Sequence, residues 1–96
     1  MIESLNKAFD SRIRLGIMSM LRVNDELTFN TLKETLAISD GNLASHITGL
    51  EKLAYIKVHK QFIGKKPNTS YTLTPLGKQA FDMHLNALEN LLKKHN

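Results

Sequence analysis

The sequence has no cysteine among its 96 residues. Disulfides, thiolate metal sites and cysteine nucleophiles are therefore excluded, and the composition is compatible with a reducing cytosol. No apolar run approaches the roughly 20 residues that a membrane-spanning helix needs. The first residues also show neither a long apolar core nor a small-residue cleavage site. We expect a cytoplasmic protein that makes no contact with a membrane.

Groupings typical of enzymes are absent as well. We find no Ser/His/Asp combination with evident roles, no glycine-rich phosphate loop and no carboxylate pair in a recognisable cleft. The chain also lacks internal repeats, low-complexity tracts and a linker, so residues 1–96 are expected to form one domain. We predict no enzymatic activity and no cofactor. In a chain this short the sequence shows no pocket for a small-molecule effector, and whether such an effector exists is left open.

Positive charge is concentrated in one segment. The chain carries 13 lysines and arginines against 9 acidic residues, a net charge of +4. The segment Lys57–Lys66 holds four lysines and one histidine but no acid, whereas acids gather at Asp25, Glu26 and Glu34 and in the last helix. A local basic patch is the expected footprint of phosphate contacts, so this segment is a candidate for binding nucleic acid.

The spacing of apolar residues predicts two helices in the first part of the chain. The first covers residues 5–22, and the pair Asp10-Ser11 leaves open whether it is continuous or begins anew there. A short extended stretch is expected at residues 26–28. A second, shorter helix follows over residues 29–36, with Thr28 as its N-cap.

A turn over residues 36–39 leads to a third helix, which Ser39 is expected to cap and which ends near residues 53–55. Its apolar stripe has the spacing i, i+4, i+7 and i+10, formed by Leu43, Ile47, Leu50 and Leu53. The opposite face carries mostly small polar groups, namely Asn42, Ser45, His46, Gly49 and Lys52. Such groups suit close contact with base edges in a major groove, although an ordinary solvated face is the alternative.

Alternating residues after the third helix predict a β-hairpin. Its strands cover residues 56–62 and 71–74, and a long tip over residues 64–68 joins them. The tip carries Lys65 and Lys66, which suits a loop that straddles a nucleic-acid backbone and reaches the minor groove. A soluble polar turn without further role is the alternative.

The last helix is expected to begin at Thr74-Pro75, with the Thr74 hydroxyl as its cap and proline at the first helical position, and to end near Lys94. Its apolar residues cover more than one stripe, which favours one face on the domain and another on a second copy of the helix packed antiparallel. Packing on its own domain alone is the other interpretation. The predicted dimerisation helix is 75–95, and the predicted interface consists of Leu5, Phe9, Phe81, Leu85, Leu88 and Leu92.

Three residues of this helix carry metal-binding groups. Asp82, His84 and His95 could ligate zinc between two crossed helices. Exposed carboxylates and imidazoles are more often solvated, however, and His95 lies beside the chain end. We therefore predict no metal and keep this set as an alternative.

The order of helix, turn, helix, hairpin and terminal helix, from Phe9 to Leu92, resembles the compact winged helix-turn-helix transcriptional regulators of the MarR/ArsR superfamily. The local patterns lie in residues 11–18, 27–33, 39–47 and 71–77, and they look like a small family of stand-alone winged helix DNA-binding domains. This resemblance implies a mainly α fold with a small β-hairpin (α+β) and a long C-terminal dimerisation helix. It also implies a homodimer on a pseudo-palindromic operator in double-stranded DNA.

The resemblance assigns residues to two DNA contacts. The recognition helix would use Asp40, Gly41, Asn42, Ser45, His46, Gly49 and Lys52. The wing would use Lys60, Lys65, Lys66 and Asn68. Asp40 would either stabilise the helix start or accept a hydrogen bond from a cytosine amino group.

The predicted function is a sequence-specific transcriptional regulator that acts as a repressor. One alternative is a winged-helix module that joins a protein assembly without binding DNA. Another is a zinc-responsive regulator, because Asp82, His84 and His95 resemble the terminal-helix zinc site of some ArsR-type sensors. The chain ends at Asn96 without the remaining ligand of that site.

Overall fold

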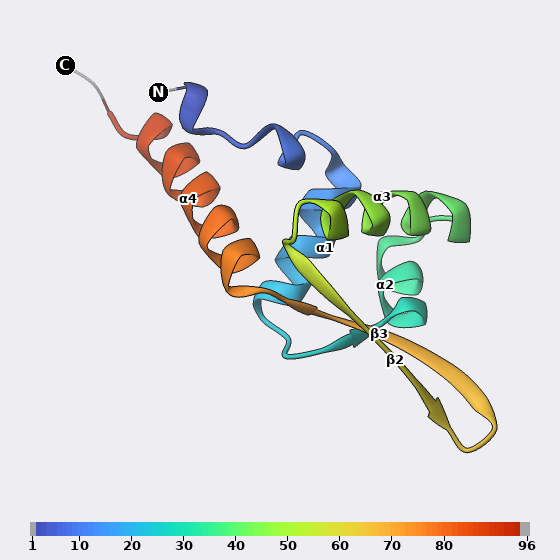
Figure 1. Ribbon diagram of the computed structural model, residues 1–96. Coiled ribbons are helices and arrows are strands. Elements are labelled where there is room, and N and C mark those ends of the chain that lie inside the picture. The colour runs from blue at the N-terminus through green and yellow to red at the C-terminus, as the bar shows by residue number, and fades with distance from the viewer. Residues whose placement is uncertain (1, 95–96) are drawn as a thin grey trace.

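The computed structural model describes residues 2–94 and has the predicted α+β architecture (Figure 1). Two short 3-10 turns, Ile2–Ser4 and Lys7–Phe9, precede the regular elements. The helices are α1 (Arg12–Arg22), α2 (Phe29–Leu36), α3 (Asp40–Lys52) and α4 (Pro75–Leu91). The strands are β1 (Leu27–Thr28), β2 (Ile56–Ile63) and β3 (Lys66–Leu73). No helix within residues 2–94 has the length and apolar character needed to cross a membrane.

Each of these four helices begins beside a hydroxyl side chain that accepts a hydrogen bond from a free backbone amide. The caps are Ser11, Thr28, Ser39 and Thr74. Such a cap stabilises a helix start by about 1 kcal/mol. The predicted caps of α2, α3 and α4 are confirmed. The cap at Ser11 also decides whether the first predicted helix is continuous: α1 begins anew there and does not continue from residue 5.

The strands form one antiparallel sheet in the order β1-β3-β2. The predicted long hairpin tip is wrong, because pairing continues to Ile63 and Lys66 and leaves only Gly64 and Lys65 in the turn. Gly64 has a φ of +65°, which suits the first central position of a two-residue hairpin turn. The pair next to such a turn, Ile63 with Lys66, exchanges both backbone hydrogen bonds, and the following pair, Phe62 with Pro67, exchanges none. Pro67 is therefore tolerated in β3 although it has no backbone N–H.

The core lies where α1, α2 and α3 meet one face of the sheet. Its members are Phe9, Ile17, Met18, Leu21, Leu32, Leu43, Ile47, Leu50, Ile56, Tyr71 and Phe81. Three of the four residues predicted as the apolar stripe of α3 are therefore buried. The fourth, Leu53, caps the helix end and is 41% exposed. The hairpin of β2 and β3, hereafter the wing, extends away from this core (Figure 1).

Helix α4 is fastened to the body at its first half. The backbone N–H of Thr74 donates to the Tyr55 carbonyl at 3.0 Å, and its hydroxyl donates to the Ala54 carbonyl at 2.6 Å. Farther along, Asp82 accepts two hydrogen bonds from Arg22 of α1, at 2.9 and 3.2 Å. The helix ends at Leu91, three residues before the predicted end, and its second half runs out beyond the body (Figure 1).

Two residues predicted to contact a second copy lie instead inside the domain. Phe9 and Phe81 are each only 3% exposed, and their rings meet edge to face with centroids 5.7 Å apart. They are buried because the 3-10 turn that contains Phe9 folds back onto α4. The predicted surface that remains consists of Leu5, which is half-buried, and three exposed leucines: Leu85 and Leu88 in α4, and Leu92 at its C-cap.

Candidate nucleic-acid interface

The exposed side of α3 is polar along its whole length. A helix turns by about 100° per residue, so the side opposite Leu43, Ile47 and Leu50 is centred on four residues. They are Gly41, Ser45, Thr48 and Lys52, all exposed, and we call them the α3 strip. Thr48 was missed in the sequence analysis, although its spacing of three from Ser45 and four from Lys52 places it on this strip. Asp40 and Asn42 are exposed beside it.

Two further predicted residues, His46 and Gly49, lie at the side of α3 that faces α1 and are half-buried. Arg14 of α1 donates from Nε to His46 Nδ1 at 3.1 Å. Its guanidinium also lies against Gly49, where an added Cβ would come within 2.3 Å of Nη2. Gly49 therefore makes room for Arg14.

Arg14 is a second residue of this region, besides Thr48, that sequence reasoning did not single out. It stands 32 positions before His46, so no local spacing relates the two. Its guanidinium places a permanent positive charge at the edge of α3. The cluster of Arg14, His46 and Gly49 thereby fixes α3 against α1 and adds a cation next to the α3 strip.

The start of α3 contains an ion pair rather than a free carboxylate. Lys33 Nζ of α2 lies 2.8 Å from Asp40 Oδ1, and the hydrogen bond and charge of that carboxylate raise the pKa of Lys33. Asp40 also stands in the first helical turn, where a negative charge interacts favourably with the helix dipole. Of the two roles considered for Asp40, these contacts favour stabilisation of the helix start.

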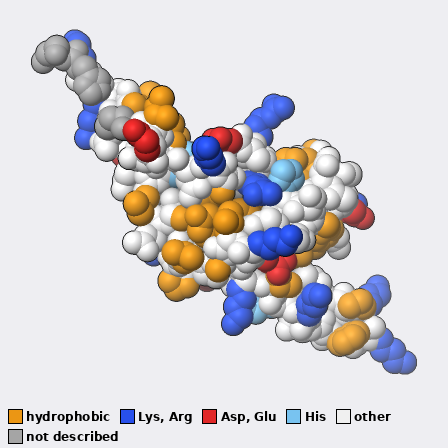
Figure 2. All heavy atoms as spheres, turned by 45° about the horizontal axis from the view of Figure 1, so that its top comes forward, with side chains coloured by type: hydrophobic (Ala, Val, Ile, Leu, Met, Phe, Trp, Pro, Cys, Tyr) orange, Lys and Arg blue, Asp and Glu red, His pale blue; other side chains and the backbone are white. Residues whose placement is uncertain are grey.

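The wing carries its lysines in two places. Lys65 and Lys66 are exposed at the tip, whereas Lys60 borders an open hollow of about 410 Å³ between the wing and the start of α2. Asn68 is half-buried and lines the same hollow. Figure 2 shows lysine and arginine side chains around the protruding wing and no acidic side chain at its tip.

The residues considered for zinc have other partners in the fold. The hydrogen bonds from Arg22 lower the pKa of Asp82. His84 is only 6% exposed, and its Nδ1 accepts a hydrogen bond from the backbone N–H of Asn6 at 3.0 Å. Its ring also stands edge-on to Phe9. His95 lies outside the described residues, and residues 2–94 contain no cluster of three or more potential metal ligands.

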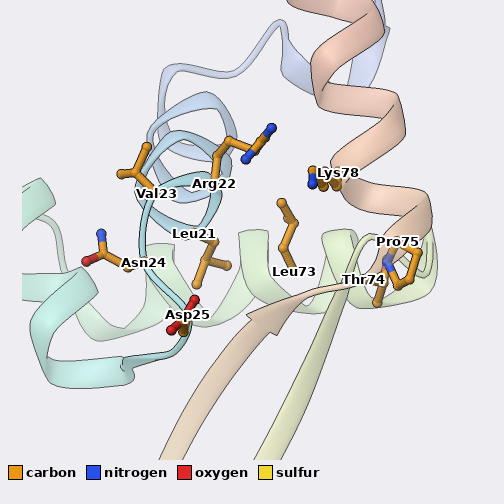
Figure 3. Close-up of a pocket in the computed structure, with 9 residues that line it drawn as sticks. All are labelled: Leu21, Arg22, Val23, Asn24, Asp25, Leu73, Thr74, Pro75 and Lys78. Carbon is orange, nitrogen blue, oxygen red and sulfur yellow. The ribbon is translucent and has the colours of Figure 1, made fainter.

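A second hollow of about 540 Å³ lies between the end of α1 and the start of α4 (Figure 3). Leu73 points into the space between these two helices, while Val23 and Asn24 stand at its rim. Val23 is 80% exposed and Arg22 is engaged with Asp82. The hollow is therefore an open surface depression and lacks the enclosure typical of small-molecule sites.

The helix pair α2–α3, the wing that follows it in the chain and the terminal helix together define a winged-helix domain. The family model described as "Winged helix DNA-binding domain" matches residues 13–92, and the chain belongs to this family. The resemblance to winged-helix regulators of the MarR/ArsR type is thus confirmed.

Known proteins of similar sequence and structure agree with this assignment. An uncharacterized protein of Methanocaldococcus jannaschii is 32% identical over 87 residues, which cover 91% of this chain and 95% of that protein. A transcriptional regulator homologue from Pyrococcus horikoshii OT3 superposes with a TM-score of 0.78 at 30% identity, over 94% of both chains. The DNA-bound structure of reduced AbfR, a protein of Staphylococcus epidermidis, has the same fold, with a TM-score of 0.77 at 22% identity over 93% of this chain and 64% of that chain. The family and its solved neighbours are regulators and not enzymes, as the sequence predicts.

Proposed function

We propose that this protein is a homodimeric, sequence-specific DNA-binding repressor. The observation that carries the proposal is the α3 strip, with its small polar side chains, beside a lysine-tipped wing in a segment without acids. From Lys52 to Phe81 the sequence contains no aspartate or glutamate. Repression would follow from steric exclusion, because a dimer seated on a promoter blocks access to it.

The two surfaces have different tasks in this proposal. The α3 strip enters the major groove, where the absence of a side chain at Gly41 and the short side chain of Ser45 allow close approach to base edges. The wing lysines contact phosphates, which raises affinity for any sequence and makes binding sensitive to salt. AbfR, which shares the fold, has been solved on DNA, and this supports DNA as the partner.

The exposed leucines of α4 support the homodimer. Phe81 is buried in the domain, and Leu85, Leu88 and Leu92 continue its line along the helix at i+4, i+7 and i+11. Within the described chain these leucines are only partly covered. They are 42%, 38% and 84% exposed. A second copy of α4 would bury them and place two α3 strips on one DNA duplex.

The direct test is selection of genomic DNA fragments by the purified protein at near-physiological salt. We expect enrichment of a motif with two-fold symmetry. Weak, salt-labile binding without sequence preference would contradict the proposal and favour a protein-interaction module.

Substitution of the wing lysines tests the phosphate contacts separately. Lys65→Ala with Lys66→Ala should weaken binding to all sequences and reduce the salt dependence of log K by about 0.9 per lost phosphate contact. Lys7→Ala, an exposed lysine in the N-terminal segment, is the matched control and should leave that slope unchanged. An unaltered slope in the double variant would remove the wing from the proposed interface.

A further inference from the structure

The wing ends in two large apolar side chains that pack against no core. Phe62 is 74% exposed and Ile63 is 64% exposed. Single exposed apolar residues are common on protein surfaces. Here, however, two adjacent ones stand at the end of the most protruding element of the described chain, where solubility alone would favour polar residues.

The strand register places these side chains on opposite faces of the wing. Phe62 pairs with Pro67, and Ile63 pairs with Lys66 in the last pair before the turn. On the face of Phe62, the next pair toward the body is Lys60 with Thr69, and the buried Tyr71 follows one pair later. One polar pair on this face, Lys60 with Thr69, thus separates Phe62 from the core, so the paired wing holds Phe62 away from the core of its own chain.

The surroundings of Phe62 favour an anionic partner. Lys60 lies on the same face, and Lys65 and Lys66 lie at the tip beside it. The apolar spheres at the end of the wing in Figure 2 are flanked by lysine and arginine side chains. The minor groove of duplex DNA matches this arrangement, because it offers stackable bases between two rows of phosphates.

We propose that Phe62 is an apolar wedge that the wing inserts at a base step of the minor groove and that bends the bound DNA. Pro67 supports the ring from the neighbouring strand, while Lys65 and Lys66 contact the phosphates on either side. Side chains such as Phe, Ile and Pro unstack base steps in this way and kink the duplex by roughly 20–90°. The inference rests on the proposed function, and it adds bent DNA as the form that the wing recognises.

The experiment compares Phe62→Ala with the unaltered full chain on a duplex taken from the fragment selection. Fluorophores at the two ends of a duplex of about 40 base pairs report its bending. A 2-aminopurine at the step facing the wing reports unstacking. The unaltered protein should raise both energy transfer and 2-aminopurine fluorescence. Phe62→Ala should lose both signals and bind within roughly tenfold of the unaltered affinity, since unstacking itself costs a few kcal/mol per step.

Two controls make the outcome specific to the wedge. Phe62→Trp keeps a flat ring and should restore both signals. Val23→Ala alters a similarly exposed apolar residue away from the wing and should change neither. Thermal unfolding of each variant verifies the fold.

Three results would overturn the inference, and they identify which proposal has failed. Equal bending by Phe62→Ala and the unaltered protein would refute the wedge and leave the proposed function intact. Binding by the unaltered protein to an unbent duplex would have the same meaning. Absence of sequence-specific binding by the unaltered protein would refute the proposed function, and the wedge with it.

Discussion

Helices α3 and α4 are both amphipathic helices packed on the core, but they leave opposite kinds of surface exposed. Each buries one side, through Leu43, Ile47 and Leu50 in α3 and through Gly77, Phe81, His84 and Ala87 in α4. The exposed side of α3 carries glycine, hydroxyl groups and a lysine. The exposed residues of α4 include Leu85 and Leu88, and Figure 2 shows hydrophobic side chains on the limb leading to the grey C-terminus.

This difference supports the proposed partner of each surface. Leucine offers no hydrogen bond to a base edge or a phosphate, so the α4 leucines gain little on DNA. Serine, threonine and lysine would lose their hydration without compensation in an apolar protein interface. The two surfaces are therefore not interchangeable, and each can be altered separately to test its role.

The largest effect is expected from charge on α4. The double variant Leu85→Glu, Leu88→Glu would bury two carboxylates between the α4 helices of the two subunits. The dimer should therefore dissociate into monomers. Loss of the second half-site contact should lower affinity for a symmetric site by about 10²–10⁴-fold. Sedimentation velocity and a binding titration measure these changes. Val23→Glu, which adds charge at another exposed apolar position, should alter neither; a dimeric double variant would show that α4 is not the contact.

The elements of this contrast follow from local sequence. Ser39 caps α3 and Thr74 caps α4 because each hydroxyl needs only an amide two or three residues ahead. The spacing of Leu43 and Ile47 then fixes which side of α3 is buried. The turn of the wing was misjudged because Pro67 suggested the end of a strand, whereas the register places it where no backbone donor is needed.

Contacts between distant segments could not be predicted in this way. Phe81 and Leu85 share one line of α4, and nothing in the spacing tells that the first is covered by Phe9 of the same chain while the second is exposed. The hydrogen bond between Arg14 and His46 likewise depends on how α1 crosses α3. The sequence therefore predicts a candidate site on α3 but not Arg14, the neighbour that contacts its edge.

The second effect concerns the α3 strip. Ser45→Ala should cost about 1–3 kcal/mol on the selected duplex and little on a scrambled one, because only base contacts discriminate sequences. Competition titrations with both duplexes measure the difference. Thr35→Ala, at an exposed threonine of α2, provides the comparison and should affect neither duplex. Equal losses on the two duplexes would contradict a reading role for Ser45.

A smaller effect is expected where α1 supports α3. Arg14→Ala removes the donor to His46 and should lower the free energy of unfolding by about 1 kcal/mol, the typical net value of one hydrogen bond. Urea denaturation measures it, with exposed Arg12→Ala as the control. His46→Ala in the Arg14→Ala background should cost less than His46→Ala alone, since the shared contact is already gone. Additive losses would mean that the two side chains act independently.

The smallest effect concerns the ion pair that joins α4 to α1. Arg22 lowers the pKa of Asp82 in the folded state, so the pair stabilises the protein above the unfolded-state pKa of that carboxyl. This contribution is lost as pH falls through the lowered folded value. Between neutral and acidic pH, the free energy of unfolding should therefore fall less in Asp82→Asn than in the unaltered protein. In Asp10→Asn it should fall as much as in the unaltered protein. Because the pair is exposed, high salt should shrink the difference. An identical acid response in both variants would leave the Thr74 hydrogen bonds and the packing around Phe81 as the contacts that hold α4 to the body.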